Sequence, residues 1–373
     1  MKKKLLIPLF LAGMVLPLGL PKDDMALAKG YFIGEFNDRT KYIKHGTEVN
    51  GQMADEGFVL LKNDGTLPLE QGARISICGK SSTNLARGGA GSGSGSVSQG
   101  VTSVDLEKSL KACGYTVNPD LIKFYGDNSK SGSGRTNGNT NWSGVSQVTI
   151  GETPMNKYSE SLIASLDEYN DLAIQVITRE GSEGCDVKSA DCRDSNSDPV
   201  TEKHALELSD NEQALFDTLK EHFNKVMFVI NSSNIFECDA LEKDDKVAAI
   251  LWIGNPGDVG PGAVGRILCG AVNPSGRTVD TWARDFTKDP TFQNFSDNQQ
   301  TNPIYDDDGK LVKFASQDTM FAADGAPMMS KGTDKAYTNH SKPRWADKDN
   351  LVVSGGINGV KPSAYVSYEE GIY

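Results

Sequence analysis

The stretch Asp171–Asp186, DLAIQVITREGSEGCD, decides the fold of this chain. Its apolar run from Leu172 to Ile177 has the length and β-branched content of a buried strand. A loop punctuated by glycine follows directly and carries the carboxylates of Glu180, Glu183 and Asp186. Open α/β sheets bind their ligands at the carboxyl ends of strands, so the stretch predicts a strand that delivers acidic side chains to a functional edge.

Strand and helix patterns alternate on both sides of this stretch. Further strands are expected at residues 73–79, 115–117, 225–230 and 247–253, and helices at 103–113, 159–169, 209–223 and 260–268, with a brief turn or helix at 241–243. Ser209 and Glu212 have the spacing of a capping box, which marks a helix start. The alternation predicts an α/β fold, a mainly parallel sheet covered by helices on both faces.

The two ends of the chain differ from this central pattern. Met1 and three lysines precede the apolar run Leu5–Leu20 and the small residues around Ala28, so residues 1–28 are predicted to be a signal peptide and the protein to be secreted or extracytoplasmic. An uncleaved membrane anchor is the alternative. We expect a lead-in at 29–50, the α/β domain at 51–285, and a loop-rich extension at 286–373, where charged and Asn/Asp-rich sequence predominates. Within the extension, residues 351–353 and 365–368 look like the ends of strands that belong to another module.

Composition limits the possible partners and cofactors. The net charge of −12 argues against nucleic acid as a partner. The four histidines are scattered without zinc-ligand spacing, so neither a metal nor another cofactor is expected. Of the six cysteines, Cys185 and Cys192 flank a polar loop and could form a disulfide, whereas the other four lie in or beside apolar segments and could be small buried hydrophobes.

Two further segments leave alternatives open. Residues 88–100, GGAGSGSGSVSQG, have the composition of a flexible linker, and the order of a P-loop is absent. Together with the parallel-sheet pattern, the segment nevertheless keeps a nucleotide-binding domain as a minor alternative. Residues 127–144, rich in Ser, Gly and Asn, are either a lid or rim element or an insertion.

The acidic loop after the central strand has the residue types that glycoside hydrolysis or metal binding needs. A general acid must keep its proton near neutral pH, which requires burial or a neighbouring negative charge. Glu180, Glu183 and Asp186 are close enough in sequence to perturb one another. From the spacing alone, an ordinary solvated acidic loop is the favoured interpretation.

Five motifs, in this order, resemble a known family. They are GFVLLKNDGTLPL at 57–69, GSGSGSV at 91–97, REGSEGCD at 179–186, WIGNPGDVGPGA at 252–263 and NPSGR at 273–277. Together they resemble the C-terminal α/β-sandwich domain of glycoside hydrolase family 3, and most closely its β-glucosidases. The resemblance covers roughly residues 50 to 285, and the end of the chain, YEEGIY at 368–373, looks like the start of the family's fibronectin-like module.

The resemblance implies roles for individual residues. In the family, the loop after this strand often reads Ser-Gly-Glu-Gly-x-Asp-Arg and supplies the general acid/base, which falls here on Glu183 with Glu180 as the fallback. Substrate contacts are predicted for Asp186 and Arg179. Val187 departs from the family pattern, because it stands where an arginine is usual. The segment between Cys185 and Cys192 departs from it as well, because it looks like an insertion.

The family's nucleophile is an aspartate in a Ser-Asp-Trp-like motif on a (β/α)8 barrel, and that triplet occurs nowhere in this sequence. Some members place the sandwich before the barrel, and a leader directly ahead of the sandwich fits that order. We therefore expect the front portion of a glycosidase acting on β-glucosides or oligosaccharides by the retaining mechanism, inactive without the barrel. The alternative is a non-catalytic carbohydrate-binding or scaffold module with the same fold.

Overall fold

The computed structural model describes residues 36, 38–89, 100–136, 149–181, 187, 192–195, 197–198 and 203–286, together with the backbone of four short strands between 302 and 360. The chain divides into two compact units, Met1–Val49 and Asn50–Tyr373. In the first unit, Asp38 Oδ1 accepts a hydrogen bond from Lys41 N at 3.0 Å at the start of helix α2 (Arg39–Gly57). The predicted signal peptide lies outside the described residues.

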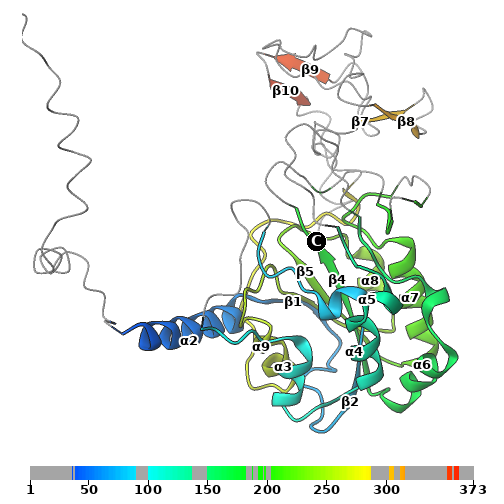
Figure 1. Cartoon of the computed structure of the whole chain (residues 1–373). Helices are drawn as coiled ribbons and strands as arrows, with labels where there is room; N and C mark the ends of the chain where they lie inside the picture. The colour runs from blue at the N-terminus through cyan, green and yellow to red at the C-terminus, as the bar shows by residue number, and fades with distance from the viewer. Residues whose placement is uncertain are drawn as a thin grey trace, which may run out of the picture. The chain divides into compact units, whose positions relative to one another are not determined.

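The second unit contains a six-stranded sheet with the order β1-β6-β5-β4-β2-β3 (Figure 1). Five neighbouring strands are parallel, and β1 pairs with β6 in the antiparallel direction. The strands are β1 (Val59–Asn63), β2 (Arg74–Cys78), β3 (Thr116–Val117), β4 (Leu172–Arg179), β5 (Val226–Ser232) and β6 (Val247–Trp252). The central position of β4 and the mainly parallel sheet confirm the predicted fold class.

The central strand is covered from both sides because all eight of its residues are buried. Ile174 and Val176 pack in one core cluster with residues of α3 (Leu106–Ala112) and α9 (Gly262–Leu268). Ala173 and Ile177 point the other way and pack in a second cluster. That cluster includes residues of α4 (Pro119–Gly126), α6 (Glu160–Ala164), α7 (Asp210–His222) and α8 (Asp239–Lys243). Helices on both faces explain why β4 is a continuous apolar run.

Helix boundaries follow the capping side chains. Helix α7 begins after Ser209 with both hydrogen bonds of the predicted capping box. Helix α3 begins three residues later than predicted, because Asp105 and not Ser103 accepts the N-terminal hydrogen bond, from Lys108 N. The single helix predicted over 159–169 is α6 followed by a 3-10 turn, Ser165–Glu168.

Three α-helices in the described part of the chain were not predicted from the sequence. Among the residues of α2, only Ala54 is buried, so no apolar stripe marks that helix. Helix α4 carries a start signature in Asn118 and Pro119, and the Asn118 side chain accepts from Asp120 N at 3.1 Å. Helix α5 (Asn128–Ser131) is a single turn inside the segment expected to be a loop.

The C-terminal extension contains two short pairs of strands. Asn302–Tyr305 (β7) pairs with Leu311–Ala315 (β8), and Leu351–Ser354 (β9) pairs with Ile357–Val360 (β10), both antiparallel. A strand beginning at Leu351 was expected, but its partner was not. Strand content predicted at 365–368 lies outside the described residues. Within the described part of the chain, no helix is long and apolar enough to cross a membrane.

The packing of β4 makes a direct prediction about stability. Ile174 is 1% exposed at the centre of the core, so Ile174→Ala should lower the free energy of unfolding by about 2–5 kcal/mol through lost burial and a cavity. Val279 is 94% exposed, and Val279→Ala should change the free energy of unfolding by less than about 0.5 kcal/mol. Guanidinium denaturation followed by circular dichroism measures both variants. Equal losses in the two variants would contradict the assignment of β4 to the core.

Candidate active site

The parallel strands bring their carboxyl ends to one edge of the sheet, and a buried amide joins three of them there. Asn231 in β5 accepts from Thr178 Oγ1 of β4 at 3.2 Å. Its Nδ2 donates to Gly254 O beyond β6 at 2.7 Å and to Ala86 O at 2.9 Å, and Ala86 N donates back to Oδ1 at 2.6 Å. Asn231 thus fixes the loop that leads into the glycine-rich segment against the ends of β4 and β6.

Glu180, the fallback acid/base residue, lies directly after β4 in an ion pair. Arg135 Nε donates to Glu180 Oε2 at 2.7 Å, and the two side chains are 8% and 9% exposed. Arg135 also donates to Asn84 O. The sequence singled out no role for Arg135, because it lies in the polar segment 127–144. The pair ties that segment to the end of the central strand.

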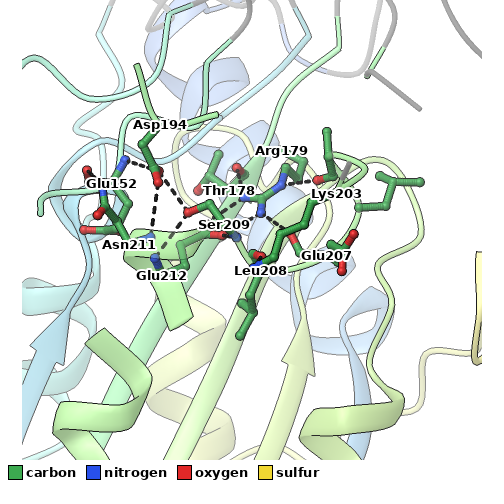
Figure 2. Close-up of polar contacts among 12 residues, drawn as sticks. Glu152, Thr178, Arg179, Asp194, Lys203, Glu207, Leu208, Ser209, Asn211 and Glu212 are labelled. Atoms are coloured by element: carbon green, nitrogen blue, oxygen red, sulfur yellow. Dashed lines mark hydrogen bonds and ion pairs between the residues drawn. The ribbon is translucent and has the colours of Figure 1, made fainter. Parts of the chain in front are cut away.

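Arg179 corrects one of our sequence-based predictions. Its side chain is 2% exposed, and its five N–H groups donate to Ala205 O, Thr178 O, Glu207 O and both carboxylate oxygens of Glu212. The two bonds to Glu212 measure 2.8 and 2.6 Å (Figure 2). A guanidinium has five N–H donors, so none is left for a sugar. Arg179 is a structural residue and not a substrate contact.

The predicted acid/base Glu183 and the predicted substrate contact Asp186 lie outside the described residues. Gly181 precedes their segment and Val187 follows it. Val187 is 4% exposed and packs in a small apolar cluster that includes Ile150 and Cys192. Burial in this cluster explains why an apolar residue can stand where the family usually has an arginine, since a cation would lose its hydration there.

Cys192 decides between the alternatives that the sequence left open for the polar loop. Its thiol is free and buried. The bridge to Cys185 that the polar loop suggested is therefore not formed in this structure. The side chain behaves as a small hydrophobe, which is the role that the sequence predicted for the other cysteines.

A buried acidic network at the same edge was not predicted from the sequence (Figure 2). The Glu152 carboxylate accepts from Lys80 N at 2.9 and 3.0 Å and from Thr153 N at 2.8 Å. Glu152 N donates to Asp194 Oδ1 at 3.0 Å, and the same oxygen accepts from Ser209 Oγ at 2.9 Å. Only tertiary folding brings these segments together, so no local pattern could have indicated the network.

Burial shifts the proton affinity of both carboxyl groups. It raises the pKa of Glu152 to about 8, and the charge of Glu212 adds to the effect. Burial, followed by the charge of Glu212, raises the pKa of Asp194 to about 6. Perturbed carboxyl groups of this kind gather at functional sites, although structural networks produce them too.

Glu152 and Asp194 line a cavity of about 1090 Å³. Its other lining residues include Thr136, Thr149 and Asn211. Within the described residues, no group of three or more His, Cys, Asp or Glu side chains could hold a metal ion. The cavity offers carboxyl, hydroxyl and amide groups that can hydrogen-bond a ligand.

The raised pKa of Glu152 predicts a pH dependence of stability. Between its ordinary value of 4.5 and about 8, the native state binds more protons than the unfolded state, so stability falls as pH rises, by at most about 1.4 kcal/mol per pH unit from this group. Glu152→Gln should flatten this slope, with part of it retained through Asp194. Guanidinium denaturation at pH 5, 7 and 9 measures the change of the free energy of unfolding with pH. Glu56 is exposed, so Glu56→Gln is the control. An unchanged slope in Glu152→Gln would show that the Glu152 carboxyl group does not have a raised pKa.

Removal of the buried guanidinium should be costly for a different reason. Arg179→Met leaves the Glu212 carboxylate buried without its cation, which should lower the free energy of unfolding by about 3–5 kcal/mol. Arg277, exposed on the surface, provides the matched control Arg277→Met. Chemical denaturation at neutral pH compares the two variants. If both behave alike, the Arg179–Glu212 pair does not hold the end of β4.

Comparisons of this chain with known proteins show which family it resembles. β-Glucosidase A of Butyrivibrio fibrisolvens is 27% identical over 292 residues, which are 73% of this chain and 33% of that protein. A β-glucosidase of Ruminococcus albus is 27% identical over 263 residues, covering 69% of this chain and 25% of that protein. The chain thus spans between a quarter and a third of the length of these relatives.

A solved structure gives the same result for the fold. The structure of β-glucosidase 3B from Thermotoga neapolitana in complex with α-D-glucose superposes with a TM-score of 0.53 at 25% identity, over 78% of this chain and 36% of that one. Residues 58–318 match the model of the glycosyl hydrolase family 3 C-terminal domain, well over half of the chain. This chain therefore belongs to glycosyl hydrolase family 3.

Proposed function

We propose that this chain supplies the general acid/base carboxylate of a retaining β-glucosidase, and that this carboxylate is Glu183. The observation that carries the proposal is the position of residues 182–186 directly after β4, whose end is held by the buried side chains of Arg179 and Glu180. The carboxyl ends of parallel strands are where α/β sheets bind ligands. The family match over residues 58–318 supports the same chemistry.

The ion pair of Glu180 favours Glu183 over the fallback. An acid/base residue must reach the glycosidic oxygen and then a water molecule. The Glu180 carboxylate is 9% exposed and is bonded to Arg135, so it is poorly placed to do either. Glu183 stands between Ser182 and Gly184 in the stretch that resembles the family's acid/base loop.

The retaining mechanism assigns two separate tasks to two carboxyl groups. Glu183 would protonate the leaving oxygen and later deprotonate the water that releases the sugar. The second carboxylate would attack the anomeric carbon and must lie roughly 5–5.5 Å away. We propose that it belongs to a (β/α)8 barrel domain outside this chain, because the Ser-Asp-Trp triplet is not found among its 373 residues.

The proposed substrate class follows from the relatives. Those compared above are β-glucosidases, so a β-glucoside is the substrate we propose for the assembled enzyme. Asp186 remains our candidate for a sugar contact. The polar cavity beside Glu152 and Asp194 lies on the same edge of the sheet and offers hydrogen-bonding groups that suit a hydroxyl-rich molecule.

Kinetics with an aryl β-glucoside test the proposal. We expect no release of p-nitrophenol by the isolated chain, and turnover once the chain is joined to a family 3 barrel that carries the nucleophile. In the joined protein, Glu183→Gln should lower kcat by about 10²–10⁴-fold, because proton transfer is lost. Glu180→Gln should cost less, since it removes an ion pair and leaves the acid/base group in place.

The alternatives give different outcomes. A joined protein that folds, binds oligosaccharide and shows no turnover would favour the non-catalytic module. A loss confined to Glu180→Gln would move the acid/base assignment to Glu180. If the isolated chain is active and keeps its activity in Glu183→Gln, two parts of the proposal are contradicted: the role of Glu183 as acid/base and the need for a nucleophile from another domain.

A further inference from the structure

Helices α3 and α9 cover one face of the sheet and lie side by side (Figure 1). Their backbones meet at Ser109 and Gly265, because a Cβ built on Gly265 would come within 2.3 Å of Ser109 O. Ser109 Oγ accepts from Gly265 N at 2.8 Å and donates to Gly262 O at 3.1 Å. Only glycine permits this approach, so the two helices are held in fixed register at this point.

One helical turn further along each helix stands a cysteine. Ser109 and Gly265 are 156 residues apart in sequence, and Cys113 and Cys269 have the same separation. Both cysteines are the C-terminal caps of their helices. The two side chains are close enough for Cys269 to contribute to the raised pKa of Cys113, and Cys269 Sγ donates to Arg266 O at 3.5 Å. The close approach of the helices therefore continues into a thiol–thiol contact.

We propose that Cys113 and Cys269 form a disulfide bond that joins the C-terminal ends of α3 and α9 when the protein meets a thiol oxidant. With glutathione disulfide as the oxidant, one cysteine thiolate attacks its sulfur–sulfur bond and releases one glutathione thiolate. The thiolate of the second cysteine then attacks the mixed disulfide and releases another. Two cysteine thiols are oxidised, and one glutathione disulfide is reduced to two glutathione molecules.

The surroundings distinguish this pair from the other cysteines that the structure describes. Cys78, Cys192 and Cys238 are buried, whereas Cys113 and Cys269 are half-buried and within reach of a small oxidant. Burial raises the pKa of Cys113 to about 11, with the neighbouring Cys269 as a further cause. Thiolate is therefore scarce at neutral pH and the bridge forms slowly, so the proposal is best tested at equilibrium.

The bridge would restrict the unfolded chain more than the native one. It joins residues far apart in sequence whose helices are already in contact, so it removes unfolded conformations without displacing the native helices. The joined helices cover the face of the sheet on which Ile174 and Val176 of β4 are buried. An oxidised protein should therefore resist thermal unfolding better than a reduced one.

Equilibration of the purified full chain in glutathione buffers of increasing oxidising potential tests the proposal. In the oxidised protein, the thiol count after denaturation should fall from six to four. Tryptic digestion should yield one cross-linked species, Ala112–Lys123 joined to Ile267–Arg277, which disappears on reduction. The melting temperature should rise by about 5 °C or more on oxidation.

Two kinds of variant make the test specific. Cys113→Ser and Cys269→Ser should each abolish both the cross-linked species and the rise in melting temperature. Cys192→Ala, which removes a buried cysteine elsewhere, should keep both. Six thiols counted after denaturation of the equilibrated protein, glutathione adducts without a cross-link, or a cross-link between other cysteines would each overturn the proposal.

Discussion

The buried guanidinium of Arg179, at the end of the central strand β4, is the interaction on which the surrounding structure depends. Placing Arg179 out of water costs several kcal/mol unless its charge is paired and its donors are bonded. Burial works against the cation, but the charge and hydrogen bonds of Glu212 outweigh burial and raise the pKa of Arg179 above its ordinary value. Glu212 also closes the capping box of α7 with Ser209, so one carboxylate serves the strand end and the helix start together.

The same edge gains rigidity from groups that lie far apart in sequence. Asp194 accepts from Ser209 Oγ and from Glu152 N, and the Glu152 carboxylate accepts from Lys80 N beyond β2. Asn231 adds a second set of bonds between the ends of β4, β5 and β6. A reacting carboxyl group needs a scaffold that holds its loop to within a fraction of an ångström. These buried bonds fix the end of β4, directly ahead of the segment of sequence that carries Glu183.

Sequence patterns predicted the elements that are determined by neighbouring residues in the sequence. The apolar run of β4 and the Ser209–Glu212 capping box were both recognised from the sequence, because burial on two faces and helix capping leave direct traces there. The start of α3 was misplaced, since Ser103 and Asp105 are both good caps and the choice depends on tertiary packing. Helix α2 has only one buried residue and so shows no periodic stripe.

The candidate site was harder to predict for a physical reason. The family motif pointed to the loop after β4, but the partners of its flanking residues come from distant segments. Arg135 lies in a polar stretch with no pattern, and only the fold brings it to Glu180. The assignment of Arg179 to substrate followed from its place in the motif, whereas the structure shows that all its donors are used within the protein.

The proposed role of Glu183 is to donate a proton to the glycosidic oxygen that leaves with the aglycone. Its most direct test is the dependence of kcat/KM on the leaving group for the barrel-joined protein and its Glu183→Gln variant. With 2,4-dinitrophenyl β-glucoside, whose leaving group needs no proton, the variant should keep nearly the full value. With an alkyl β-glucoside, it should lose about 10²–10⁴-fold. An equal loss with both substrates would contradict the claim, because Glu183 would then act on something other than the leaving oxygen.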